Sequence, residues 1–214
     1  MPVGIPKVPF QGPEEEEASW VDLYNRLYRQ RSIFLGERLD TTLGNQIVGL
    51  LTYLNIEDPT TDIDFFINSP GGGIRPGVSV YDMMGGVEAD VQTICIGTAA
   101  SMACFLLLGG EPTKRIAYPH ARVMMHQPIA DLTVSPSGID HFMEMSETAR
   151  LYYACIKGYA QRTRKPTWLI HKDMLRDTFM TPEEAQVYGI IDQIGMDTPE
   201  ESQAYEIFDK IGMD

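Results

Sequence analysis

Residues 91–108, VQTICIGTAASMACFLLL, decide the fold of this chain. The apolar run 91–96 is typical of a buried strand, and the apolar run 102–108 is typical of a helix. Between them, residues 97–101 form a strand-to-helix junction that ends in Ser101. A serine at such a junction can point its hydroxyl out of the fold while its own backbone N–H faces a reacting oxygen. The stretch therefore makes Ser101 a candidate nucleophile.

Strand and helix patterns alternate on both sides of this stretch. Strands are expected at 32–36, 62–68, 115–118, 122–125 and 190–194, and helices at 20–31, 41–56, 77–88, 137–162 and 181–189. Such alternation is typical of βαβ units with a mostly parallel sheet in one α/β domain. Residues 1–13 contain four prolines and are expected to form an extended, mobile arm.

The expected helix 137–162 is unusually apolar, with few charges in its middle. A projecting helix of this kind needs a partner surface, but an ordinary core helix fits the pattern equally well. The pattern alone leaves both interpretations open.

Composition limits the class of protein. The chain has 214 residues with 43% hydrophobic and 22% charged residues, as in a globular domain with one core. The net charge of −13 argues against binding to nucleic acid or to anionic membranes. No apolar run is long enough for a membrane span, and the first residues resemble neither a secretion signal nor a transit peptide. Three cysteines without CxxC spacing, Cys95, Cys104 and Cys155, predict buried free thiols.

Three further segments supply the other parts of a serine acyl-transfer site. His126 ends a predicted strand, Asp177 lies further on, and the glycine-rich loop 68–73 can donate backbone N–H groups. Each part alone is weak evidence, because strand-end serines are usually caps and glycine runs are usually turns. Other chemistries fit less well: the sequence has no GxSxG, no HExxH or paired Cys/His set, no P-loop and no GxGxxG. We therefore expect no metal and no nucleotide cofactor.

Five motifs together point to a family. These are INSPGG, TICIGTAASMA, RVMMHQP, RDTFMTPEEA and YGIID, in that order. Their combination resembles the ClpP family, the proteolytic subunits of an ATP-dependent protease, from Pro2 to about Gly195. The resemblance implies a crotonase-like α/β fold of repeated ββα units with a projecting handle helix at about 137–162. It divides the chain into a mobile axial segment (1–19), a peptidase domain (20–196) and a C-terminal tail (197–214).

The resemblance also implies residue roles. Ser101 would be the nucleophile, His126 the general base and Asp177 the residue that orients it. The N–H groups of Gly72 and Met102 would form the oxyanion hole. Substrate would be bound by Gly73, Ile74 and Ile129, with the segment 72–74 pairing with the substrate backbone as an added strand.

Partners and location follow from the same resemblance. Two stacked seven-membered rings, which we expect to include related Clp subunits, would enclose a chamber. An AAA+ unfoldase would use ATP to feed unfolded proteins into it. The segments PVGIPKVPF and WVDLYNRLY resemble the plastid-encoded and cyanobacterial branch, and the acidic run 14–17 favours the plastid. The expected location is the chloroplast stroma, with the cyanobacterial cytoplasm as the alternative.

Three positions depart from the family pattern. Asp64 and Gly86 replace bulky apolar residues of the pocket in which the unfoldase docks, whereas Phe66, Ile94 and Ile116 keep the rest of it apolar. Docking on this subunit would then be weaker or carried by other subunits. Leu175 replaces an acid that pairs with an arginine across the rings. Two alternatives to a serine endopeptidase stay open: a mainly structural ring subunit, and a crotonase-like acyl-CoA enzyme.

Overall fold

The computed structural model describes residues 4–10, 19–127 and 138–195, and in them a mostly parallel seven-stranded sheet and a separate hairpin. The sheet order is β3-β4-β5-β6-β9, with β7 paired to the end of β5 and β8 antiparallel to β7. The strands are β1 Lys7–Phe10, β2 Ser19–Asp22, β3 Ser32–Leu35, β4 Ile63–Ser69, β5 Val91–Ala100, β6 Arg115–Ala117, β7 Arg122–Met125, β8 Thr178–Met180 and β9 Gln193–Ile194. The helices are α1 Leu23–Tyr28, α2 Thr41–Glu57, α3 Ile74–Gly86, α4 Met102–Leu108, α5 Gly138–Thr163, α6 Thr167–Met174 and α7 Pro182–Tyr188.

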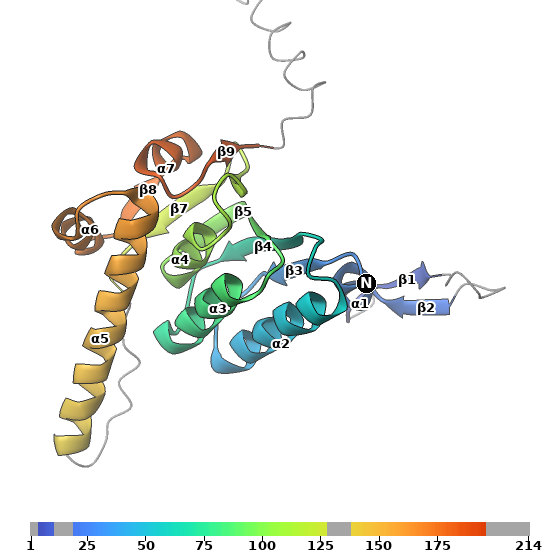
Figure 1. The fold of residues 1–214 in the computed structure, drawn as a ribbon, viewed down its shortest axis with the longest axis horizontal. Helices are drawn as coiled ribbons and strands as arrows, with labels where there is room; N and C mark the ends of the chain where they lie inside the picture. The colour runs from blue at the N-terminus through green and yellow to red at the C-terminus, as the bar shows by residue number, and fades with distance from the viewer. Residues whose placement is uncertain (1–3, 11–18, 128–137, 196–214) are drawn as a thin grey trace, which may run out of the picture.

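The helices α2, α3 and α4 lie side by side against the sheet, and α5 projects from the body of the molecule (Figure 1). Helix α2 begins where the Asp40 carboxylate accepts a hydrogen bond from the Leu43 N–H at 2.8 Å. Its apolar stripe is buried against the sheet, as the spacing of Ile47, Leu51 and Leu54 predicts. Helix α4 is buried throughout, so the strand–helix unit forms the centre of the core.

The strand in the central unit is longer than the sequence pattern suggests. It was expected to end at residue 96, but β5 continues through Gly97 to Ala100. Its first half pairs with β4 and β6, and its last three residues pair with β7. Gly97 permits the bend between the halves, because its φ is +79° and a Cβ there would lie 2.7 Å from the Asn68 Oδ1. Two strand segments therefore precede one helix, as expected for a ββα unit.

The N-terminal region departs from expectation. Residues 7–10, expected in a mobile arm, form β1 and pair antiparallel with β2. The helix expected over 20–31 begins only at Leu23, because the Asp22 carboxylate caps it there. Arg29 and Arg26 lie over the Phe10 ring, at 4.8 and 5.2 Å from its centroid. The expected boundary between residues 19 and 20 thus falls inside β2, and the tail 197–214 lies outside the described residues.

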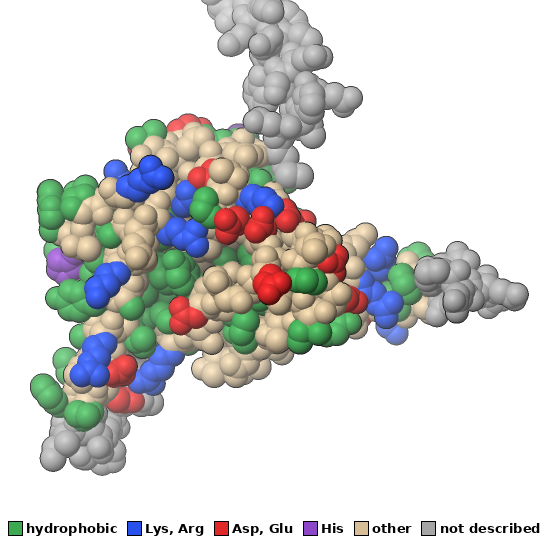
Figure 2. All heavy atoms as spheres, viewed as in Figure 1, with side chains coloured by type: hydrophobic (Ala, Val, Ile, Leu, Met, Phe, Trp, Pro, Cys, Tyr) green, Lys and Arg blue, Asp and Glu red, His purple; other side chains and the backbone are tan. Residues whose placement is uncertain are grey.

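Both interpretations of the apolar pattern apply to the long helix α5. Cys155, Ile156 and Tyr159 are buried in the core of this chain. Phe142, nearer the start of α5, and Tyr153 are 69% and 62% exposed, and hydrophobic side chains lie beside charged ones on the projecting part of the molecule (Figure 2). One part of α5 is therefore a core helix, and another presents an apolar surface.

The three cysteines are buried and free, as the sequence predicts. Burial raises the pKa of each thiol to about 12. Among the described residues, no helix is long and apolar enough to cross a membrane.

Candidate active site

Ser101 lies at the point where β5 passes into α4. Its backbone has φ 56° and ψ −123°, a conformation that L-residues rarely adopt and that is common at functional sites. Its N–H donates to the Met124 carbonyl at 2.9 Å, which anchors the serine to β7. That N–H is therefore not directed at a reacting oxygen, contrary to the expectation for the junction. The next N–H, of Met102, opens α4 and has no intrahelical acceptor.

The glycine-rich loop 68–73 packs directly against Ser101. The Ser69 hydroxyl donates to the Glu37 carbonyl at 2.6 Å and accepts from the Gly71 N–H at 3.0 Å. A Cβ at Gly71 would lie 2.5 Å from the Ala100 carbonyl oxygen and 2.7 Å from the Ser101 Cβ. Glycine is thus required for the loop to approach the nucleophile this closely.

Leu39 holds the other side of the loop. Its N–H donates to the Gly71 carbonyl and its carbonyl accepts from the Gly73 N–H, both at 2.9 Å. These two bonds make Leu39 and Gly72 a parallel β-bridge. In the described part of the chain, neither the Gly72 N–H nor the Met102 N–H donates to another protein group. These two N–H groups are the ones expected to form the oxyanion hole, and both belong to segments that flank Ser101.

The residues expected to bind substrate, Gly73, Ile74 and Ile129, are placed differently from one another in the structure. The Gly73 N–H is bonded to Leu39, and its carbonyl accepts from the Gly77 N–H at 3.2 Å, so this backbone has no free N–H for an added strand. Ile74 begins α3 and its side chain is buried, which limits it to its backbone N–H. The added strand over 72–74 stays a prediction: α3 begins at Ile74, and among the described residues the Gly72 N–H donates to no other group. Ile129 lies outside the described residues.

His126 and Asp177 are brought together by two antiparallel strands. His126 follows β7 and Asp177 precedes β8, and the register pairs their neighbours Met125 and Thr178. The His126 Nδ1 lies 3.0 Å from the Asp177 Oδ1. A carboxylate at that distance accepts the Nδ1 proton and leaves Nε2 as the basic nitrogen. The His126 side chain is 16% exposed and that of Asp177 65%.

Ser101 and His126 face one cavity of about 210 Å³, lined also by Arg38, Pro70, Gly71 and Gly72. In the described structure the two catalytic candidates share this cavity without a hydrogen bond between them. Such bonds often tighten only when substrate is bound. Sequence reasoning missed Arg38, because no local pattern connects an arginine after β3 with a serine after β5.

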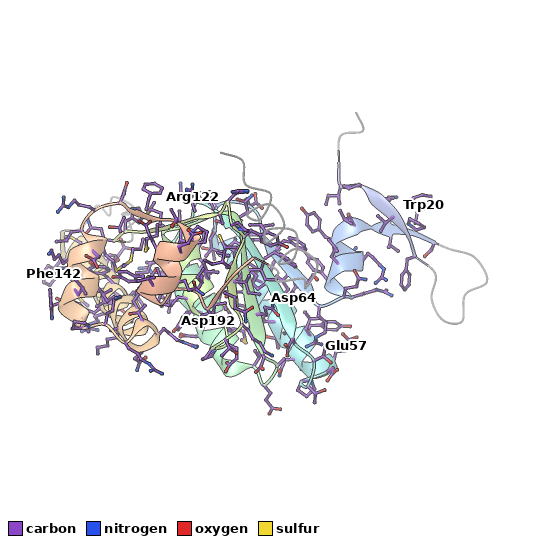
Figure 3. All side chains as sticks on the ribbon, turned by 90° about the horizontal axis from the view of Figure 1, so that it is seen from above. Trp20, Glu57, Asp64, Arg122, Phe142 and Asp192 are labelled. Atoms are coloured by element: carbon purple, nitrogen blue, oxygen red, sulfur yellow. The ribbon has the colours of Figure 1, made fainter. Side chains whose placement is uncertain are left out.

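The three residues that depart from the family pattern are not among the residues that line this cavity. Asp64 is half-buried on β4, between the N-terminal hairpin that carries Trp20 and the α5 end that carries Phe142 (Figure 3). Burial, and then the charge of Asp62, raises the pKa of Asp64.

Asp64 lies on the same face of β4 as Phe66, two residues on, whose ring stacks on Phe34 with a centroid distance of 4.9 Å. Asp64 thus adjoins an apolar surface, as expected. Ile94 and Ile116, expected to line the same pocket, are 2% and 5% exposed in the single chain. A Cβ at Gly86 would meet no atom within 4 Å.

Leu175 is the C-cap residue that follows α6, two residues before Asp177, and it is 54% exposed. Among the described residues, no three His, Cys, Asp or Glu side chains are grouped as metal ligands would be.

Comparison with known proteins gives a consistent result. A family model described as Clp protease matches residues 14–198. Similar proteins from Helianthus annuus, Lactuca sativa and Nicotiana tabacum are each called ATP-dependent Clp protease proteolytic subunit. Each is 53% identical over 197 residues, which cover 92% of this chain and 100% of the relative.

Proposed function

Because this chain belongs to the Clp protease family, we propose that Ser101, His126 and Asp177 are the catalytic residues of its serine endopeptidase activity. The observation that carries the assignment is the arrangement around one cavity. Ser101, in its rare backbone conformation, lines the same cavity as His126, whose Nδ1 is bonded to Asp177. This is the constellation of nucleophile, base and orienting acid that acyl transfer needs.

The geometry supports a two-step hydrolysis. Asp177 holds the Nδ1 proton of His126, so that Nε2 takes the proton of the Ser101 hydroxyl as the oxygen attacks the peptide carbonyl. The N–H groups of Gly72 and Met102 donate to the oxyanion of the tetrahedral intermediate. The imidazolium then protonates the leaving amine, and water hydrolyses the acyl-enzyme through the reverse proton path.

The partners follow from the family. Its members work in oligomeric rings with a Clp unfoldase. For this chain we propose two stacked heptameric rings that include related Clp subunits and receive unfolded proteins from an AAA+ unfoldase. The exposed apolar surface of α5 supports burial between rings. ATP is used by the unfoldase, so this chain needs no cofactor.

We propose the chloroplast stroma as the location. The support is that the similar proteins named above come from plants, and that the N-terminal motifs resemble the plastid branch.

The test is the variant Ser101→Ala in the assembled protein. Cleavage of short fluorogenic peptides should fall by a factor on the order of 10⁶, while the mass of the assembly stays that of the wild type. A fluorophosphonate should label the wild type at Ser101 and leave the variant unlabelled. Substantial cleavage by purified Ser101→Ala would refute the assignment, and an acyl-CoA enzyme without a nucleophilic serine would show no labelling of the wild type.

A further inference from the structure

We propose that Arg38 is a specificity-determining residue that favours substrates with an acidic side chain next to the scissile bond. The inference rests on the proposed peptidase function, because it concerns the same cavity. Of the six described residues that line this cavity, Arg38 is the only one with a permanent charge. A substrate carbonyl in contact with Ser101 therefore brings its neighbouring side chains close to a guanidinium.

The backbone on both sides of Arg38 is fixed to the loop that carries the oxyanion donors. The Glu37 carbonyl accepts from the Ser69 hydroxyl at 2.6 Å. Leu39 exchanges two hydrogen bonds with the same loop and is 1% exposed. Since Leu39 is anchored in the core, Arg38 extends from a rigid position at the wall of the cavity.

The side chain of Arg38 can act on a substrate from this position. It is exposed, and its guanidinium has five N–H donors, so it can keep its contact within the chain and still donate to a substrate carboxylate.

The charge of the whole chain makes a local cation informative. With a net charge of −13, the chain by itself repels acidic substrates. A guanidinium at the wall of the catalytic cavity places a positive charge near the scissile bond, and its planar fork fits a carboxylate in a bidentate manner. The preference should therefore act close to the scissile bond and leave more distant substrate positions unaffected.

The experiment uses matched fluorogenic peptides that carry Glu, Gln or Lys immediately before or after the scissile bond. With the assembled wild type, kcat/KM for the better-placed Glu peptide should exceed that for its Gln counterpart about fivefold, as for a partly exposed ion pair. Added salt should reduce this ratio. Arg38→Gln should bring the ratio close to one, Arg38→Lys should keep part of it, and Arg38→Glu should favour the Lys peptide.

The control is Arg26→Gln, which removes the same charge beside Phe10, away from the cavity, and should keep the wild-type ratio. If Arg38→Gln and Arg38→Glu cleave with the wild-type ratio, the inference is overturned while the peptidase function stands. If no peptide is cleaved in a manner that depends on Ser101, the proposed function fails and the inference fails with it.

Discussion

The substitution Gly71→Ala tests the closest packing in the site. Gly71 has a φ of +88°, and an added Cβ would lie 2.5 Å from the Ala100 carbonyl oxygen and 3.0 Å from the Met102 nitrogen. To reach an ordinary contact distance of 3.4 Å, the loop must move away from Ala100 by about 0.9 Å. The positive φ adds a cost of roughly 1–2 kcal/mol for any L-residue.

The consequence for catalysis follows from where the loop must go. Two hydrogen bonds to Leu39, both at 2.9 Å, oppose its movement, so strain is shared between loop and nucleophile. In the proposed mechanism the Gly72 N–H donates to the oxyanion, and in the variant it would move with the loop away from that position. Misplacement by about 1 Å, or loss of one oxyanion donor, lowers the rate by about 10²–10³. We expect a fall of that size in kcat for short peptides, in a protein that still folds and assembles.

The assay is steady-state peptide cleavage with a thermal unfolding scan of each preparation. Gly49→Ala is the matched control, because an added Cβ there meets nothing within 4 Å on the exposed side of α2. Alanine in a helix interior should stabilise the protein by up to about 1 kcal/mol and leave kcat unchanged. A wild-type kcat for Gly71→Ala would refute the close packing, and an unfolded Gly71→Ala would show that the loop cannot absorb the strain.

Two further outcomes follow from the packing. Burial alone would raise the pKa of Asp192, but its hydrogen bonds to the nearly buried Arg115, one of 2.6 Å, outweigh burial and lower that pKa. The ion pair therefore stabilises the folded protein at pH values above the ordinary carboxyl pKa. This stabilisation is lost as the pH falls through the lowered pKa of Asp192. Asp192→Asn should lower the free energy of unfolding by about 3–5 kcal/mol at neutral pH and weaken its decrease at acidic pH. An unchanged dependence of the unfolding temperature on acidic pH would contradict this. In α5, Ile156→Asp should destabilise the single chain because Ile156 is 2% exposed, whereas Tyr153→Asp, at a site 62% exposed, should leave the unfolding temperature nearly unchanged and reduce the assembled mass in analytical ultracentrifugation. Equal effects of the two α5 changes on unfolding would contradict the division of that helix.

Much of the fold was predictable from local patterns. Helix α2 follows from the spacing of Ile47, Leu51 and Leu54, and α7 from Thr181 and Pro182 at its start, where the capping box forms. These signals work because the contacts behind them join residues three or four positions apart. The roles proposed for Ser101, His126 and Asp177 were also predictable from the sequence, through the order and content of the motifs that surround them.

The arrangement of the site was decided by tertiary structure. His126 and Asp177 are 51 positions apart and meet only because β7 and β8 pair in one register. Whether β5 ends at residue 96 or continues to Ala100 depends on the pairing of its last residues with β7. The Gly73 N–H is taken by Leu39, and Arg38 reaches the cavity, because one short segment after β3 lies beside the glycine loop. Such contacts join segments distant along the chain and depend on the packing of the whole core, which no local pattern encodes.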